Sequence, residues 1–94
     1  MPYALVQVTF EDYEKWRVVF NEAASLRKTY GSSGVQVFRK MDKPNEVVIL
    51  GEYEDLEKAR QMFQPQEFRD TTQRAGVVGR PEVSFLEDAG RLPA

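Results

Sequence analysis

The reactive side chains of this chain are few, because its 94 residues include no cysteine and no histidine. Their absence excludes zinc sites built on Cys or His, haem held by His, and Ser-His or Cys-His nucleophile pairs. It also removes the usual acid or base near neutral pH. The Asp and Glu residues form no cluster with the spacing of a magnesium or calcium site. We therefore expect no metal and no cofactor, and any chemistry falls to arginine, tyrosine, tryptophan and carboxylates.

Arg27 stands out among these, because helical spacing puts it in the middle of an apolar face. One helix is predicted from Asp12 to about Tyr30, and its apolar face carries Tyr13, Trp16, Val19, Phe20, Ala23, Leu26 and Tyr30. An arginine there must find an acceptor or reach water along its stem. One interpretation pairs it with a carboxylate such as Glu52 or Glu54, or extends it past the helix end. The other aims its planar set of donors at a ligand carboxylate or enolate in a cleft.

Small residues on a later helix favour a cavity beside this arginine. The helix predicted from Pro65 to about Ala75 turns Phe68, Thr71, Thr72 and Ala75 inward, and three of these four are small. Small side chains opposite an aromatic helix leave space. The candidate ligand-pocket residues are Tyr13, Trp16, Phe20, Arg27, Phe38, Phe63, Phe68 and Thr72. The alternative is that bulky neighbours fill the space and leave an ordinary core. No catalytic residue is assigned.

The elements that must position these residues follow from propensity and turn signals. Strands are predicted at residues 3–9, 34–39, 46–53 and 82–87, helices at 12–30, 55–63 and 65–75, and a loop at 77–81. Asp12 and Asp55 are the expected N-caps. The order β-α-β-β-α(α)-β is the split βαβ, or ferredoxin-like, pattern, an α+β fold whose four-stranded antiparallel sheet carries its helices on one face. We expect a single domain over residues 1–94, with a core at about 3–87 and a tail at 88–94.

Composition excludes several partners. The net charge of −2 argues against a nucleic-acid-binding surface, which usually needs a basic face. No apolar run approaches the length of a membrane span. The first residues, Met1 to Val6, carry no positive region before their apolar stretch, so we expect no signal peptide and a cytoplasmic location.

The predicted strands are apolar on both faces. Val47 to Leu50 are four consecutive apolar residues, and Tyr3 and Leu5 oppose the apolar set of the first strand. A strand that is apolar on both sides needs cover on both sides, and the chain has too few helices to provide it. We therefore expect a homodimer in which two sheets pack face to face. The alternative is a scatter of surface hydrophobes, which monomers tolerate.

Several segments of the chain carry a family resemblance. They are Asp12–Trp16 (DYEKW), Val37–Arg39 (VFR), Pro44–Val47 (PNEV), Glu57–Arg60 (EKAR) and Pro81–Glu87 (PEVSFLE). Together they resemble small bacterial proteins of the dimeric α+β barrel superfamily, the antibiotic biosynthesis monooxygenase-like and cyclase-like proteins. The resemblance covers about residues 3–87. It implies the ferredoxin-like fold, a homodimer and a small aromatic ligand.

What the resemblance implies about activity is broader. Quinone-forming monooxygenases of this superfamily use a pocket Asn, Trp, Tyr and Arg to bind a phenolic substrate and stabilise its anion for reaction with O₂. Trp16, Arg27 and either Tyr13 or Tyr30 supply similar residue types here, without a clear Asn. The haem-degrading branch binds haem through a His and is excluded. The leading hypothesis is a cofactor-independent monooxygenase or an isomerase or cyclase acting on an aromatic or polyketide-like metabolite. The alternatives are a non-catalytic binding or structural homodimer, and a partner-dependent regulatory module.

Overall fold

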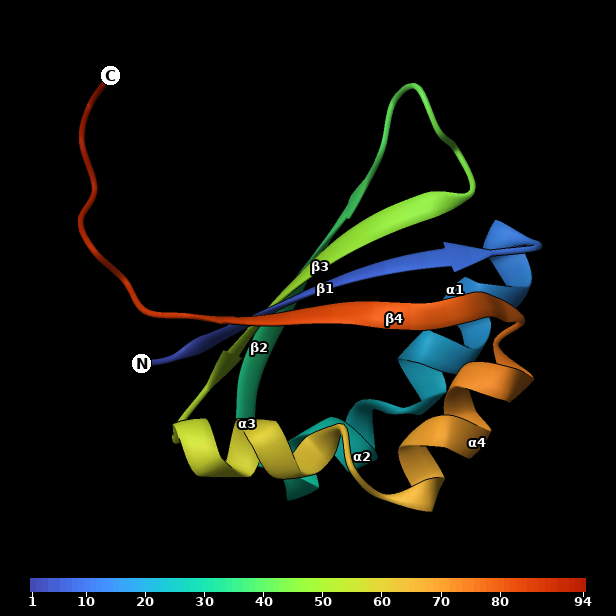
Figure 1. Ribbon diagram of the computed structural model, residues 1–94, viewed down its shortest axis with the longest axis horizontal. Helices are drawn as coiled ribbons and strands as arrows, with labels where there is room; N and C mark the ends of the chain where they lie inside the picture. The colour runs from blue at the N-terminus through green and yellow to red at the C-terminus, as the bar shows by residue number, and fades with distance from the viewer.

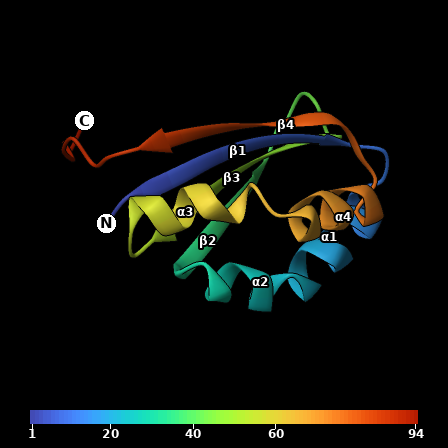
Figure 2. The same ribbon diagram turned by 60° about the horizontal axis from the view of Figure 1, so that its bottom comes forward.

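The computed structural model describes residues 1–94 as one antiparallel sheet with all four helices on one of its faces (Figures 1 and 2). The strands are β1 (Tyr3–Phe10), β2 (Ser32–Arg39), β3 (Glu46–Tyr53) and β4 (Val77–Leu86), in the spatial order β2-β3-β1-β4. The helices are α1 (Tyr13–Glu22), α2 (Ala24–Thr29), α3 (Leu56–Met62) and α4 (Gln66–Arg74). The predicted α+β ferredoxin-like fold is confirmed.

The two central strands, β1 and β3, place their apolar side chains alternately toward the helices. Along both strands every second residue is buried, and these residues are Ala4, Val6, Val8 and Phe10 in β1 and Val47, Ile49, Gly51 and Tyr53 in β3. This period of two is the geometry of a pleated strand with one covered face. The residues between them lie on the opposite face, which no helix covers (Figure 2).

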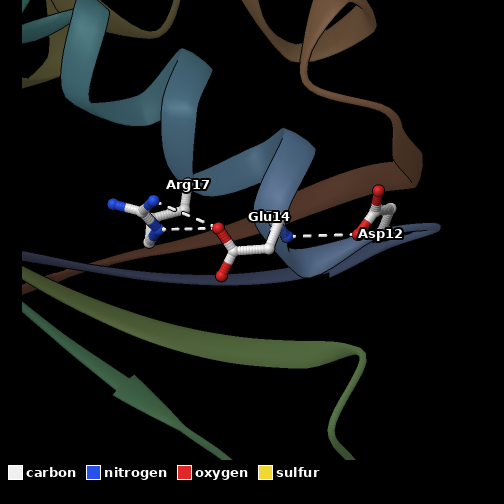
Figure 3. A network of polar contacts seen from close by, with 3 residues as sticks. All are labelled: Asp12, Glu14 and Arg17. Atoms are coloured by element: carbon white, nitrogen blue, oxygen red, sulfur yellow. Dashed lines mark hydrogen bonds and ion pairs between the residues drawn. The ribbon is translucent and has the colours of Figure 1, made fainter.

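Both predicted helix caps are confirmed. The Asp12 carboxylate accepts a hydrogen bond from the Glu14 backbone N–H at 3.1 Å, and Asp55 accepts one from the Glu57 N–H at 2.8 Å. Each cap satisfies an N–H that has no partner inside its helix. Glu14 also forms an exposed ion pair of 3.1 Å with Arg17 one turn along α1 (Figure 3).

The predicted single helix from Asp12 to Tyr30 is wrong, because the helix breaks at Ala23 into α1 and α2. At the break the Phe20 carbonyl accepts a hydrogen bond of the 3₁₀ type from the Ala23 N–H at 3.3 Å. The same carbonyl accepts a hydrogen bond from Arg27 Nη1 at 2.7 Å. A cationic donor at a helix C-terminus satisfies a free carbonyl and opposes the negative end of the helix dipole. Arg27 therefore stabilises the end of the helix that precedes its own.

The predicted loop at residues 77–81 is also wrong, because this segment is the first half of β4. Gly79 adopts a positive φ of 73°, and the register between β1 and β4 shifts between Gln7 and Thr9. A bulge of this kind keeps a strand paired across residues that otherwise signal a turn. Pro81 is compatible with β4 because this is an edge strand, where a missing N–H costs no sheet hydrogen bond.

The C-terminal segment is exposed. Residues 87–94 form no helix or strand, and Figure 1 shows this tail extending away from the sheet. None of the four helices has the length and hydropathy required to cross a membrane.

Candidate functional site

A cavity of about 80 Å³ lies between the helices and the covered face of the sheet. Its walls are mostly apolar. The lining residues are Ala4, Val6, Val8, Val35, Ile49, Gly51, Tyr53, Val77 and Pro81 from the sheet, and Trp16, Val19, Phe20, Ala23, Leu26, Arg27, Met62, Phe63, Phe68, Thr71, Thr72 and Ala75 from the helical layer. Thr71, Thr72 and Ala75 line it as their small size predicted. No carboxylate and no amide side chain is among the lining residues.

Six of the eight residues predicted to form the pocket line this cavity: Trp16, Phe20, Arg27, Phe63, Phe68 and Thr72. The other two do not. Phe38 pairs with Val48 across the sheet and is 49% exposed, so it lies on the open face. Strand alternation could have excluded it, since it is one residue away from the inward-facing Val37. Tyr13 packs beside Phe10 and Trp16 with the Arg39 guanidinium 4.0 Å above its ring, outside the cavity.

The aromatic residues of α1 form a stacked column that ends at Arg27. The centre of the Trp16 ring lies 6.2 Å from that of Tyr13 and 4.8 Å from that of Phe20, and both pairs of rings are stacked. The Arg27 guanidinium carbon lies 4.1 Å from the centre of the Phe20 ring. Two groups this close to one ring cannot share a face without collision, so both faces of Phe20 are occupied. A ligand can meet Phe20 only at its edge, and the column acts as a wall. Trp16 is 4% exposed, which confirms its predicted burial.

Arg27 has no carboxylate partner. Its contacts are the Phe20 carbonyl and the Phe20 ring. Neither predicted partner reaches it, because Glu54 pairs with Lys58 at 3.7 Å and Glu52 alternates with the inward-facing Gly51 and Tyr53. Desolvation by burial lowers the pKa of Arg27, and the nearby Tyr53 partly opposes this effect. The cavity thus holds a half-buried cation whose charge no anion of the protein neutralises.

Tyr53 is the site residue that the sequence predictions missed. It is 3% exposed, lines the cavity, and its hydroxyl donates to the Met62 thioether sulfur at 2.9 Å. A thioether is a weak acceptor, so this hydroxyl is incompletely satisfied. Burial raises the pKa of Tyr53, and the Arg27 charge partly opposes the rise. The signal for Tyr53 was present in the sequence, since a period of two from Val47 places it on the inward face.

Gly51 makes room for the Tyr53 ring. A Cβ atom at position 51 would lie 3.0 Å from Tyr53 Cε2, a contact that a tightly packed strand does not accommodate without displacing the ring. The two residues are on the same face of β3, two positions apart. The missing side chain of Gly51 therefore sets where the Tyr53 hydroxyl can lie.

The two threonines of α4 contribute little free polarity to the cavity. Thr71 Oγ1 donates to the Glu67 carbonyl at 2.7 Å, and Thr72 Oγ1 donates to the Arg69 carbonyl at 2.8 Å. Such bonds to the preceding turn occupy the hydroxyl protons of helical threonines. The side-chain donors of the lining that make no bond to their own helix are thus those of Arg27, Tyr53 and the Trp16 indole. Elsewhere in the chain, no group of three or more Asp or Glu side chains is arranged to hold a metal ion.

Comparison with known proteins finds solved structures with a similar fold and low sequence identity. No family model and no curated relative matches this chain. Among solved structures, SnoaB from Streptomyces nogalater, a cofactor-independent oxygenase, superposes with a TM-score of 0.75 at 17% identity, covering 99% of this chain and 96% of that one. A proposed antibiotic biosynthesis monooxygenase from Bordetella bronchiseptica superposes with a TM-score of 0.78 at 13% identity, covering 94% of this chain and 96% of that one. A further proposed antibiotic biosynthesis monooxygenase, from Caulobacter crescentus, superposes with a TM-score of 0.74 at 14% identity, covering 95% of this chain and 90% of that one.

This chain has the fold of the antibiotic biosynthesis monooxygenase-like proteins. The resemblance seen in the sequence is thereby confirmed at the level of the fold, over nearly the full length of both chains. Of the residue types expected in a quinone-forming pocket, Trp16 and Arg27 line the cavity, the tyrosine on the lining is Tyr53 instead of Tyr13 or Tyr30, and no Asn lines the cavity.

Proposed function

We propose that this protein binds a small phenolic or enolic molecule in the cavity and acts as a cofactor-independent monooxygenase. The observation that carries the proposal is the Arg27 cation in an apolar cavity, without a carboxylate partner. An antibiotic biosynthesis monooxygenase-like fold shared with a cofactor-independent oxygenase supports it.

Arg27 would act on the protonation state of the ligand. A guanidinium beside a phenol favours the phenolate, so the phenol loses its proton at lower pH than it does in water. The apolar walls strengthen this effect, because charge interactions grow as water is excluded. The anion is the electron-rich form that O₂ can attack.

The reaction balances without an added reductant. A phenol with a free para position and one O₂ give a para-quinone and one water. The ring carbon loses its hydrogen and gains one oxygen atom, while the phenol O–H becomes the second carbonyl. The other oxygen atom leaves as water with these two hydrogens. The four electrons come from the substrate, and the chain's contribution is to bind, orient and ionise it.

The protein is also proposed to be a homodimer through the open face of its sheet. That face carries a row formed by Leu5, Val48 and Leu50, with Phe38, Val78 and Leu86 around it, and the last three are 49%, 51% and 39% exposed. Contiguous exposed apolar side chains of this extent are typical of protein interfaces. A second copy of the sheet would cover them.

The test of activity is oxygen uptake with a panel of para-unsubstituted phenols, followed by mass spectrometry after reaction under ¹⁸O₂. We expect one labelled oxygen in the quinone, and loss of activity in Arg27→Met, which keeps the bulk of the stem and removes the charge. Lys28→Met, an exposed neighbour outside the cavity, is the matched control. Uptake that is unchanged in Arg27→Met contradicts the role of Arg27.

Thermal melts distinguish the proposed function from a structural role. If Arg27 serves a ligand, anionic aromatics should raise the melting temperature of the wild type but not that of Arg27→Met, while neutral aromatics should stabilise both proteins equally. If Arg27 serves the fold alone, its loss uncaps α1, and no anion stabilises either protein. The second result, with no oxygen uptake, leaves a non-catalytic homodimer.

A further inference from the structure

We infer that the Met62 thioether is a peroxide-reactive site inside the fold. Hydrogen peroxide that enters the cavity oxidises Met62 to its sulfoxide, and the Tyr53 hydroxyl then holds the new oxygen atom. The site requires only the cavity, the sulfur and the hydroxyl, so it exists whether or not the protein oxygenates a phenol.

Met62 differs from the other two methionines of the chain in its surroundings. Met1 and Met41 are exposed, whereas Met62 is 7% exposed and lines the cavity. A buried methionine is ordinarily protected, because an oxidant in solution does not reach its sulfur. The side chain of Met62 borders an internal space, so burial in the fold does not by itself exclude a small oxidant.

The cavity is large enough for hydrogen peroxide. Its volume is about 80 Å³. An internal space of roughly 10–15 Å³ is enough for one water molecule, and hydrogen peroxide needs about the room of two. A polar guest also needs hydrogen-bonding partners, and the lining includes the Tyr53 hydroxyl and the Arg27 guanidinium.

The Tyr53 hydroxyl is placed to stabilise the sulfoxide. It donates to Met62 Sδ at 2.9 Å, and a thioether is a weak acceptor. A sulfoxide oxygen is a stronger acceptor, because the bond between sulfur and oxygen is highly polar. A sulfoxide buried without a donor disrupts a core. The Tyr53 hydroxyl supplies that donor, so oxidation of Met62 is compatible with the folded state.

Gly51 leaves room for the added oxygen atom beside this hydroxyl. Gly51, Tyr53 and Met62 all line the cavity, and a Cβ atom at position 51 would lie 3.6 Å from the Tyr53 hydroxyl oxygen. Because Gly51 has no side chain, this space stays open. The Met62 side chain is flexible, so a small rotation brings the sulfoxide oxygen into the space and within reach of the hydroxyl.

The oxidation balances with hydrogen peroxide as the single co-reactant. A lone pair of the Met62 sulfur attacks one peroxide oxygen, so that an S–O bond forms and the O–O bond breaks. The sulfur loses two electrons and the peroxide gains them. The proton of the transferred oxygen passes to the departing oxygen, which leaves as water.

The first experiment compares two oxidants in one protein. Hydrogen peroxide and tert-butyl hydroperoxide both oxidise exposed methionines, but the second carries a bulky alkyl group. Peptide mass spectrometry gives the oxidation rates of Met62 and Met41, and the exposed Met41 is the internal standard. The chain has no cysteine, so no thiol competes for the oxidant.

We expect hydrogen peroxide to oxidise Met62 more slowly than Met41 while the circular dichroism spectrum stays that of the folded protein. The ratio of the Met62 rate to the Met41 rate should be roughly tenfold or more higher with hydrogen peroxide than with tert-butyl hydroperoxide, because access to the sulfur limits its oxidation. Equal ratios for the two oxidants, or a Met62 that stays reduced, overturn the inference.

A destabilised variant tests whether the oxidant reaches Met62 through global unfolding. Val47 is fully buried and does not line the cavity. Val47→Ala should raise the unfolded fraction by roughly thirtyfold. Oxidation through the cavity should keep nearly the same rate at Met62 in this variant. Oxidation through the unfolded chain should accelerate by the same factor as the unfolded fraction, and that result overturns the inference.

Tyr53→Phe tests the role of the hydroxyl, in a Met41→Leu background that removes the fully exposed thioether. Oxidation of Met62 should leave the melting temperature of the background protein nearly unchanged. It should lower that of Tyr53→Phe by roughly 5 °C or more, because the sulfoxide oxygen is then buried without a donor. Tyr30→Phe is the matched control, since Tyr30 packs near Tyr53 but does not line the cavity.

Equal losses of melting temperature in the background protein and in Tyr53→Phe would mean that the Tyr53 hydroxyl does not hold the sulfoxide oxygen. Met62→Leu in the same background keeps a similar volume without the sulfur, and peroxide should leave its melting temperature unchanged. If Tyr53→Phe does not fold, the comparison of the two oxidants in the wild type still decides whether Met62 reacts through the cavity.

Discussion

The two faces of the sheet are built from the same strands but have different surroundings. Val47 and Val48 are neighbours in β3, yet Val47 is fully buried under the helices and Val48 points to the open face. On the covered face, apolar side chains pack against helices and leave a cavity whose lining includes Arg27, Tyr53 and Trp16. On the open face, apolar side chains such as Val48 are only partly covered by their own sheet, because no helix packs on them. An alternating strand thus contributes to a packed core on one face of the sheet and leaves apolar side chains without a covering layer on the other.

The largest expected effect comes from placing a charge on each face. Val47→Asp buries a carboxylate without a partner, which costs roughly 3–5 kcal/mol, a large part of the stability of a small domain. We expect this variant to be mostly unfolded by circular dichroism. Val48→Asp should keep its fold and lose the dimer, so light scattering should give the mass of one 10.8 kDa chain instead of two.

Two results would contradict this contrast. A wild-type protein that is a monomer at micromolar concentration removes the proposed interface. A Val48→Asp variant that remains a dimer moves the interface to another surface. Ser25→Asp, at an exposed position of α2 on the other side of the sheet, is the matched control and should leave the mass unchanged.

A milder pair of variants measures the same contrast as a concentration dependence. Val47→Ala removes two buried methyl groups and should lower the free energy of unfolding by about 2 kcal/mol at any protein concentration. Val48→Ala should lower it only at concentrations where the dimer forms, because association adds to stability by mass action. Urea denaturation at low and high protein concentration checks both. Equal losses at all concentrations for Val48→Ala would show that its face is covered within the monomer.

Glycines on opposite faces provide the next test. Gly51→Ala places its Cβ 3.0 Å from Tyr53 Cε2, so we expect a loss of about 1–3 kcal/mol through overpacking, together with weaker binding of 4-nitrophenolate, an anionic phenol that quenches Trp16 fluorescence. Gly34→Ala, on the open face of β2, meets no atom within 4 Å and should be neutral or slightly stabilising. Chemical denaturation measures the stability, and Trp16 quenching measures the binding. Unchanged binding in Gly51→Ala would mean that the position of Tyr53 does not matter to the ligand.

The smallest effect is a pH dependence of stability at the covered face. Burial raises the pKa of Tyr53 above its unfolded value of 10.0. Below that pH both states keep the proton, and above it the unfolded chain releases the proton first. The contribution of Tyr53 is therefore complete below about pH 10 and is lost as the pH rises toward the folded pKa. Tyr53→Phe should show a shallower decline of unfolding free energy above about pH 10 than the wild type, and an identical decline would contradict the burial effect.

Much of the fold was predictable because it depends on local signals. Strand propensity and turn signals predicted β3 with its observed bounds, and Asp12 and Asp55 marked the starts of α1 and α3 through their caps. Trp16 was placed correctly because helical spacing put it among apolar residues. Each of these features is decided by neighbours a few positions away.

The misplaced site residues failed for two different reasons. Phe38 and Tyr13 were included for their aromatic type, although strand alternation already separated Phe38 from the inward face. Tyr53 was omitted although a period of two put it on the inward face of β3, because its contact with Met62 and its place on the cavity lining appear only in the structure. The missing Asn has no substitute among the lining residues.

The sequence by itself determined the order of elements, the caps, and which strand residues share a face, because propensity, capping and periodicity act over a few residues. Only the tertiary structure decided the break at Ala23, the strand at residues 77–81, and the presence of Arg27 and Tyr53 on the lining of one cavity. In each case a group beyond the immediate neighbours supplies the deciding interaction. Arg27 reaches back to the Phe20 carbonyl, β1 holds residues 77–81 despite Gly79 and Pro81, and the sheet brings Tyr53 opposite α2.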